Sequence, residues 1–236
     1  MRAVRLGTPL PPAELVLVLV KAWQTARVAT EVPALTARGG HVLTLQNGLG
    51  NVEKLGARAL LGVTSQGATL TGPGRVRPCG DGPTHIAGPD SLAAVFRSAG
   101  LDARAVDPAR GASLAWGKLA VNAGINALGA ILRVPNGQLL ARPEALTLLE
   151  CAANEVAEVA RAKGITLPFP DAAAEARRVA AATAANLSSM LQDVRRGAPT
   201  EIDAINGAVV REGARFLVPT PANETLLRLV TARVAA

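Results

Sequence analysis

Leu15-Val16-Leu17-Val18-Leu19-Val20 is an unbroken apolar run, and residues 41–45 (His-Val-Leu-Thr-Leu) form a second, shorter one. The first run is typical of a strand that lies in a parallel sheet and is covered on both faces, and residues 41–45 are read as a second strand. Between them, residues 24–38 have a helical pattern, and Gly39-Gly40 is suited to end that helix. A strand, a helix and a strand in this order predict a right-handed unit with two parallel strands.

The alternation of strands and helices continues as far as residue 107. After a turn at Asn47-Gly48-Leu49-Gly50 we expect these elements: a short helix over 52–58, a third strand over 60–64, antiparallel strands and turns over the Gly- and Pro-rich residues 67–88, a helix over 90–99 capped by Asp90, and an edge strand over 103–106. From Pro108 onward helical periodicity dominates, with breaks at 135–137, 164–170, 197–199 and 219–221. The sequence therefore predicts an α/β plus all-α fold, in which a partial Rossmann-like parallel-sheet domain (1–107) precedes an all-helical C-terminal domain (108–236).

The composition argues against several classes of protein. The 236 residues carry a formal net charge of +7, but the basic residues are scattered and there are only two Trp and three Phe, so we expect no nucleic acid partner. The first apolar run is too short for a signal peptide or a membrane span, which predicts a soluble, cytoplasmic protein with no membrane partner. Cys79 and Cys151 lie far apart, which indicates two unpaired thiols and no metal site.

One feature of nucleotide-binding sheets is missing from the sequence. Such a sheet normally opens with a strand, a Gly-x-Gly-x-x-Gly turn and a helix whose N-terminus holds the pyrophosphate. No predicted strand is followed by that turn, and Gly72-Pro73-Gly74 opens no helix. Either the chain binds no dinucleotide or its front is missing, and the closeness of Met1 to the first strand favours a missing front. That strand would then keep an unpaired edge, which favours self-association.

The segment from Trp116 to Asn126 places Lys118, Asn122 and Asn126 at successive i, i+4 positions. On a helix the direction drifts by about 40° per step, so an ammonium group and two amides share one face. Their donors and acceptors could hold a carboxylate and hydroxyls and place a proton donor beside a carbonyl. The spacing equally allows ordinary interhelical hydrogen bonds for the two amides and a solvated lysine.

Two further polar clusters follow in the helical region. Asn186, Ser188 and Ser189 lie within about one helical turn, and Pro199-Thr200-Glu201 has the pattern of a helix start at which a carboxylate is favoured by unpaired amides. Helix capping alone would also explain both clusters.

Six segments, in order along the chain, resemble ketopantoate reductase (2-dehydropantoate 2-reductase). They are residues 20–24 (Val-Lys-Ala-Trp-Gln), 46–50 (Gln-Asn-Gly-Leu-Gly), the Lys118 helix, 135–137 (Pro-Asn-Gly), 186–193 and 200–206. The resemblance runs from about residue 14 to the C-terminus. It implies an oxidoreductase that reduces 2-dehydropantoate (ketopantoate) to pantoate with NADPH, in pantothenate and coenzyme A biosynthesis.

The resemblance also implies roles for individual residues. Lys118 would contact the substrate carbonyl and donate the proton, and Glu201 would lie near the cofactor ribose and the reacting centre. The substrate-binding residues that it implies are Asn122, Asn126, Asn136, Asn186 and Ser189. The cofactor-binding residues that it implies are Lys21, Asn47, Ala68 and Glu201, with NADP as the cofactor and a small 2-oxo acid as the substrate.

The chain departs from the family pattern at its front, since full-length relatives begin with the glycine-rich turn. It therefore resembles an N-terminally truncated member of the family. Two alternatives stay open on the sequence: an inactive truncated remnant, and a non-catalytic helical interaction protein. We also expect a homodimer, with the helical domain serving both substrate binding and dimerisation.

Overall fold

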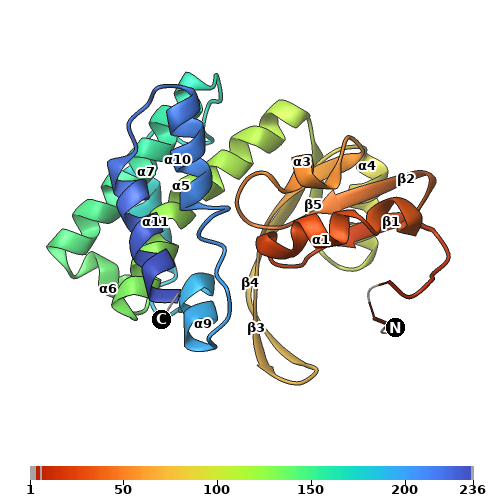
Figure 1. The fold of residues 1–236 in the computed structure, drawn as a ribbon, viewed down its shortest axis with the longest axis horizontal. Helices are drawn as coiled ribbons and strands as arrows, with labels where there is room; N and C mark the ends of the chain where they lie inside the picture. Colours follow the sequence, from red (N-terminus) through yellow and green to blue (C-terminus); the bar gives the residue numbers. More distant parts are fainter. Residues whose placement is uncertain (1–3, 6, 235–236) are drawn as a thin grey trace. The chain divides into compact units, whose positions relative to one another are not determined.

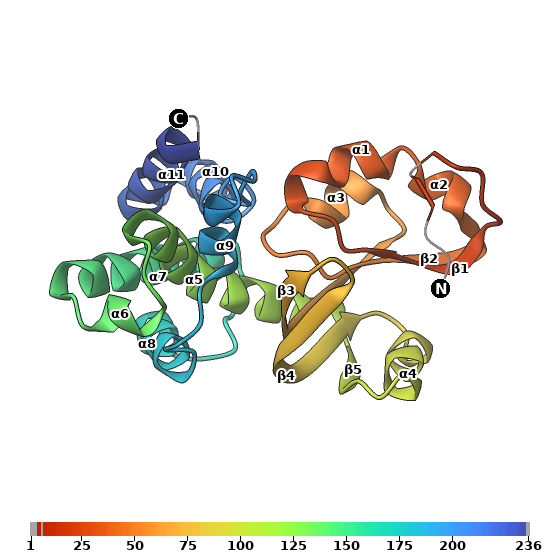
Figure 2. The ribbon, with the colours of Figure 1, turned by 90° about the horizontal axis from the view of Figure 1, so that it is seen from below.

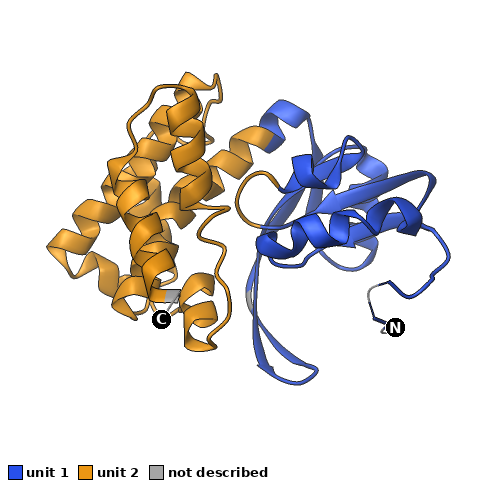
Figure 3. Ribbon diagram, in the orientation of Figure 1, with its two compact units in different colours: residues 1–46, 51–111 blue, residues 47–50, 112–236 orange. Residues whose placement is uncertain are grey.

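The structure is a computed structural model that describes residues 4–5 and 7–234. Met1, where the first predicted domain begins, lies outside these residues, and the side chain of Cys79 is not described. The chain divides into two compact units: residues 1–46 with 51–111, and residues 47–50 with 112–236 (Figure 3). The division at Gly111 lies close to the predicted domain boundary, but it assigns the turn at 47–50 to the second unit.

Within the described residues, unit 1 is built on a five-stranded sheet whose spatial order follows the sequence (Figure 1). Its strands are β1 (Ala13–Val18), β2 (Thr36–Thr44), β3 (Ala59–Gly72), β4 (Arg75–Ala87) and β5 (Ala103–Val106). The pairs β1–β2, β2–β3 and β4–β5 are parallel, whereas β3 and β4 are antiparallel. The predicted strands and the antiparallel region are confirmed, and β3 and β4 are longer than expected.

Neighbouring residues of β2 face opposite sides of the sheet, as side chains of a strand do. Val42 packs into a core with Val32, and Leu43 packs into a second core with Phe96 of α4 (Asp90–Ser98). Val42 and Leu43 are both buried, so β2 is covered on both faces.

The expected coverage on both faces is wrong for β1, which is an edge strand of the described sheet. Leu17 is 43% exposed, and Leu19, just after the strand, is 62% exposed. These side chains are exposed because the helix α4 contacts β5 and β4, at the opposite edge of the sheet from β1. The structure thus agrees with the expected unpaired edge of this strand.

The single helix predicted over 24–38 is wrong. The structure has three short helices there: η1 (Ala22–Gln24), α1 (Thr25–Ala29) and α2 (Val32–Leu35). Pro33 lies in the first turn of α2, where its missing N–H is harmless, but a continuous helix would need that donor. Gly39-Gly40 lies inside β2 and caps no helix. A Cβ on Gly40 would lie 3.0–3.1 Å from carbonyl oxygens of Ala13 and Glu14, so glycine suits this close approach of β1.

Two smaller predictions also change. The short helix after the turn is α3 (Asn51–Leu55), which ends earlier than expected. Asp90 is not the cap of α4, because Pro89 occupies that position and Asp90 instead forms an ion pair with Arg97 (2.8 Å). Beyond Thr64, β3 and β4 continue as a two-stranded arm, because β3 last pairs with β2 at Leu61 and β5 pairs with residues 84–87 of β4 (Figures 1 and 2).

The described part of unit 2 outside residues 47–50 is helical, as the sequence predicts. Its helices are α5 (Pro108–Leu132, which starts in unit 1), α6 (Gly137–Leu140), α7 (Pro143–Ala162), α8 (Ala172–Ala182), α9 (Ser189–Arg195), α10 (Asn206–Arg215) and α11 (Pro221–Val234). The core gathers residues of α5, α7, α8, α10 and α11, including Leu119, Leu149 and Leu226. A Cβ on Gly124 would lie 2.9 Å from the carbonyl oxygen of Leu149, so glycine allows α5 and α7 to pack closely. None of the described helices combines the length and the apolarity that a membrane crossing requires.

The helix start predicted at residues 199–201 is wrong, because α10 begins only at Asn206. Residues 201–205 form a turn in which the carbonyl of Glu201 accepts the backbone N–H groups of Ala204 (3.0 Å) and Ile205 (3.1 Å). The backbone of Ile205 (φ −99°, ψ −91°) leaves the helical region and separates this turn from α10.

Candidate functional site

One face of α5 carries the three polar residues that the sequence places at i, i+4 spacing. Asn122 is half-buried and Asn126 is 6% exposed, and within the described chain neither side-chain amide has a hydrogen-bond partner. The neighbouring positions Leu119 and Ile125 are buried in the core. Polar groups in such positions are normally paired, so two unpaired amides on one face indicate a place for a ligand.

Lys118 lies one helical turn before Asn122 on the same face. Burial lowers the pKa of Lys118 to about 8, because the charged ammonium form loses its hydration. The carboxylate of Glu201, which is buried in the turn before α10, acts in the opposite direction and raises this pKa. A lysine with this pKa exists mainly as the ammonium form at neutral pH and can still release a proton to a basic oxygen.

Asn136 and Asn186 are brought together by the backbone. The N–H of Asn136 donates to the carbonyl of Asn186 (3.0 Å), and its side-chain Nδ2 donates to Oγ1 of Thr183 (2.9 Å). Oδ1 of Asn136 is buried and has no partner among the described residues. A Cβ on Gly137 would lie 2.6 Å from Cβ of Ala184, so the close packing at this position explains the glycine of the Pro-Asn-Gly motif.

The two serines before and in α9 have different surroundings. Ser188 is buried, caps α9 by accepting the N–H of Leu191 (3.2 Å), and donates to the carbonyl of Asn126 at a long 3.4 Å. Ser189 is half-buried, and its hydroxyl has no partner within the described residues. Capping therefore explains Ser188, while Ser189 keeps its hydroxyl available beside the helix that carries Asn126.

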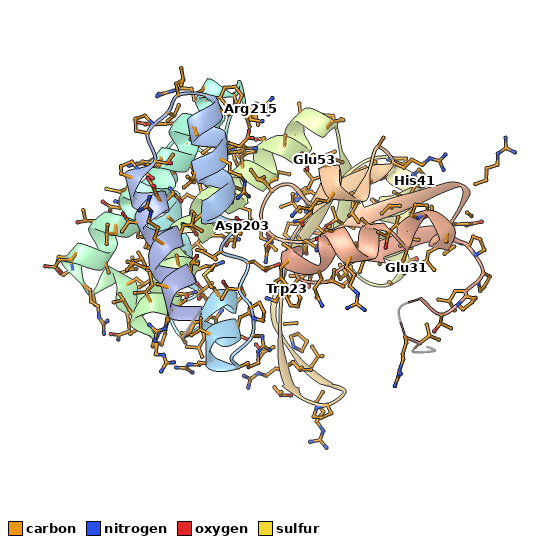
Figure 4. The ribbon with its side chains drawn as sticks, in the orientation of Figure 1. Trp23, Glu31, His41, Glu53, Asp203 and Arg215 are labelled. Carbon is orange, nitrogen blue, oxygen red and sulfur yellow. The ribbon has the colours of Figure 1, made fainter. Side chains whose placement is uncertain are left out.

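The turn after β2 belongs to the helical unit. The N–H of Leu49 donates to the carbonyl of Ala204 (2.9 Å), three residues after Glu201. Gly48 has φ +81°, and a Cβ there would lie 2.3 Å from that same carbonyl oxygen. These contacts seat the turn that carries Asn47 on the segment 201–205, in which Figure 4 labels Asp203.

Lys21 follows β1 at its carboxyl end, as Asn47 follows β2. It precedes η1, where Figure 4 labels Trp23. Gln46 ties the two strand ends together, since its Nε2 donates to the carbonyl of Val20 (2.6 Å) and to Oγ1 of Thr25 (2.9 Å). The sequence motif contains Gln46, but its bracing role was not predicted.

Ala68 lies elsewhere in unit 1. It is exposed on the two-stranded arm and pairs with Pro78, seven residues along β3 from Leu61. The structure does not bring Ala68 together with the ends of β1 and β2.

Sequence reasoning also missed a buried polar network in unit 2 that joins Glu155, Asn206 and Asn223. Its signal in the sequence is weak, because Glu155 is one of four glutamates in α7 and differs from the others only in lying among the buried residues of that helix, where a carboxylate rarely lies without partners.

The chain is similar to known proteins along most of its length. The family model described as ketopantoate reductase PanE/ApbA matches residues 3–90, and the model of its C-terminal domain matches residues 112–234. The 2-dehydropantoate 2-reductase of Archaeoglobus fulgidus is 40% identical over 229 residues, which cover 92% of this chain and 76% of the relative.

Solved structures give the same result. A PanE/ApbA family ketopantoate reductase from Ralstonia eutropha JMP134 is 35% identical with a TM-score of 0.86, over 94% of this chain and 76% of that one. D-mandelate dehydrogenase in a ternary complex with NADH and anilino(oxo)acetate is 29% identical with a TM-score of 0.87, over 95% of this chain and 77% of that one. The chain therefore belongs to the ketopantoate reductase family, and its activity is that of an oxidoreductase, the reduction of 2-dehydropantoate to pantoate with NADPH.

Proposed function

We propose that Lys118 is the proton donor of this reduction and that the amides on its helix bind the substrate. The observation that carries the proposal is one face of α5, on which a lysine with a pKa of about 8 lies beside two amides that have no partner in the described part of the chain. As the carbonyl of the 2-oxo acid is reduced, its oxygen gains negative charge. The ammonium group of Lys118 can stabilise that charge and then transfer a proton to the oxygen.

The remaining polar groups of unit 2 suit the other ends of the substrate. Asn122 and Asn126 offer N–H donors for a carboxylate, and Ser189 can donate to or accept from a hydroxyl. Asn136 and Asn186 lie together on the adjoining loops and complete the proposed set. We assign Glu201 to holding Lys118 in its charged form, because its carboxylate opposes the effect of burial.

The residues that follow β1 and β2 along the chain are the candidates for cofactor binding. Lys21 supplies a cation and Asn47 an amide after neighbouring parallel strands, which is the edge where open parallel sheets bind ligands. We propose these two residues for the NADPH that, when bound, supplies the hydride. Ala68 stays in the proposal as a backbone contact only, since it lies on the exposed arm.

The proposal is tested by turnover and by binding on the same protein. Lys118→Met should lower kcat for 2-dehydropantoate by about 10²–10⁴-fold, which is the usual contribution of a general acid. NADPH binding, followed by fluorescence titration, should be unchanged in this variant.

Lys163→Met is the matched control, because Lys163 is also half-buried in unit 2 but pairs with Glu212 and lies over the Phe216 ring. Equal kcat in the Lys118 and Lys163 variants would remove Lys118 from the mechanism. If the unsubstituted chain neither binds NADPH nor forms pantoate, the proposed mechanism is replaced by one of the two alternatives, an inactive truncated remnant or a non-catalytic helical interaction protein.

We infer a cytoplasmic location, since reducing compartments keep thiols such as the exposed Cys151 unpaired. The absence of a nucleic acid partner stays a prediction.

We also infer that the chain forms a homodimer through an apolar groove of unit 2. The groove has a volume of about 270 Å³ and is lined by Leu128, Ile131, Leu132, Arg142, Glu144, Ala145, Leu148, Thr225, Leu226 and Leu229. Leu132, Leu148 and Leu229 are 38–50% exposed around it. Arg142 and Glu144 carry opposite charges at its rim, and neither has an ion-pair partner in the described structure, so a two-fold axis would pair each with the other on the second copy.

A further inference from the structure

Asn206, Asn223 and Glu155 form a continuous hydrogen-bonded chain inside unit 2. Both asparagines are fully buried, and Glu155 is 9% exposed. The carboxylate of Glu155 accepts the backbone N–H groups of Ala222 (2.7 Å) and Asn223 (2.9 Å), and also Nδ2 of Asn223 (2.7 Å). Burial of a carboxylate is costly without such donors, so this group of contacts depends on all its members.

The orientation of both amides is fixed by their partners. Nδ2 of Asn223 also donates to the carbonyl of Ala152 (3.0 Å). Nδ2 of Asn206 donates to Oδ1 of Asn223 (3.0 Å) and to the carbonyl of Ala123 (3.0 Å). Rotation of the Asn206 amide would place its oxygen against two acceptors. The chain of hydrogen bonds therefore runs from α7 and α11 through α10 to α5 in one defined arrangement.

Asn206 keeps this arrangement at a cost. Its Oδ1 atom is buried and has no hydrogen-bond partner among the described residues. An unpaired buried acceptor destabilises the fold, and the hydrogen bonds that Asn206 donates offset this cost. The two donated hydrogen bonds are what this residue contributes.

These donated bonds connect the segments that carry Lys118 and Glu201. Ala123 lies five residues after Lys118 on α5, and Asn206 lies five residues after Glu201. The turn between Glu201 and Asn206 is closed by two backbone hydrogen bonds to the Glu201 carbonyl (3.0 and 3.1 Å), which limits its movement. A bond from Asn206 to Ala123 therefore holds the whole turn against α5.

We propose that Asn206 is a positioning residue that holds the Glu201 turn on α5 and thereby sets the place of the Glu201 carboxylate relative to Lys118. Asn223 and Glu155 fix the Asn206 amide from the opposite side. The inference deepens the roles proposed above for Lys118 and Glu201 and rests on them. Without this hold, the Glu201 carboxylate is free to move toward water, and its effect on Lys118 weakens.

The test measures the ionisation of Lys118 directly. The chain has four lysines (Lys21, Lys54, Lys118 and Lys163), so selective labelling with ¹³C-lysine gives few signals, and Lys118→Met assigns the one of interest. Glu201→Gln should lower the pKa of Lys118 by about one unit, the low end of the effect of a neighbouring opposite charge. Asn206→Ala should lower it in the same direction, and the double variant should be no lower than Glu201→Gln alone.

Ser188→Ala is the matched control, because Ser188 is also a buried polar residue that donates to an α5 carbonyl but does not connect to the Glu201 turn. It should leave the pKa of Lys118 unchanged. The proposal is overturned if Asn206→Ala leaves this pKa at its original value, or if its effect adds fully to that of Glu201→Gln. It is equally overturned if Glu201→Gln itself has no effect.

A milder variant keeps the test open if Asn206→Ala does not fold. Asn206→Ser retains a hydroxyl that can make one of the two donated bonds, and it should give a smaller shift in the same direction. The NMR titration needs no turnover, so a failure of the proposed function, seen as unchanged kcat in Lys118→Met, is distinguishable from a failure of this inference.

Discussion

Lys118 links the fold to the pH dependence of the reaction. Its pKa is lowered to about 8 by burial, with Glu201 acting in the opposite direction. A proton donor must be protonated, so kcat should fall as the pH rises through about 8. Glu201→Gln removes the carboxylate that raises this pKa, and the fall should then move to lower pH.

The measurement is kcat as a function of pH between about 5.5 and 10.5 at saturating substrate. A decline that begins only near the ordinary lysine pKa of 10.5 would mean that Lys118 is not desolvated in the working protein. An unchanged profile in Glu201→Gln would remove Glu201 from the ionisation of Lys118.

Asn126 and Asn206 are both buried asparagines, but their amides are used differently. The Asn126 amide has no partner among the residues that the structure describes, whereas the Asn206 amide donates two hydrogen bonds. Asn126→Ala should therefore raise KM for 2-dehydropantoate by about 10–100-fold, as expected for the loss of a hydrogen bond to a charged group, with little change in Tm. Asn206→Ala should lower Tm by several degrees, because it leaves Asn223 without its donor. A loss of Tm in Asn126→Ala with unchanged KM would mark that amide as structural.

The turn at residues 47–50 is the element whose glycines are best explained. Gly48 and Gly50 both have positive φ, +81° and +84°. A Cβ on Gly48 would lie 2.3 Å from the carbonyl oxygen of Ala204, whereas a Cβ on Gly50 would meet nothing within 4 Å. Gly48→Ala should thus unseat the turn from the segment 201–205 and weaken the binding that depends on Asn47. Gly50→Ala pays only for the backbone conformation, about 1 kcal/mol.

The comparison of the two variants separates strain from contact. We expect Gly48→Ala to lose at least 2 kcal/mol more of unfolding free energy than Gly50→Ala in urea titrations, because backbone atoms must move to remove the overlap. Its Kd for NADPH should rise at the same time. Equal losses in both variants would show that the turn is not seated on Ala204.

At the scale of elements, the sequence pattern predicted strands reliably where a segment has one clear run of apolar residues. A strand was predicted over residues 41–45 and lies in β2, where Val42 and Leu43 are buried on opposite faces of the sheet. The predicted helix over 24–38 failed because helical periodicity does not reveal that Pro33 starts a new helix or that Gly40 lies against β1. Gly40 suits a tertiary contact with β1, and no local sequence signal distinguishes such a glycine from one that ends a helix.

At the scale of the molecule, the order of strands and helices and the family resemblance gave the fold and the reaction. The face of α5 could be predicted because i, i+4 spacing is a local property. The network of Glu155, Asn206 and Asn223 could not, because its members are 17 to 68 residues apart and meet only through helix packing. Burial and hydrogen bonds across such distances follow from the whole fold.

The same scale holds the prediction of a homodimer. Arg142→Glu places two like charges at the rim of the groove, so a two-fold interface would bring acidic groups together and dissociate. Exchanging both residues, Arg142→Glu with Glu144→Arg, restores opposite charges across the axis and should restore the dimer. The molar mass of each variant is measured by light scattering during size-exclusion chromatography, with Leu148→Ser as a test of the apolar part. A double exchange that stays monomeric would show that the rim charges do not meet across a two-fold axis, and a monomeric unsubstituted chain would show that the groove does not bind a second copy.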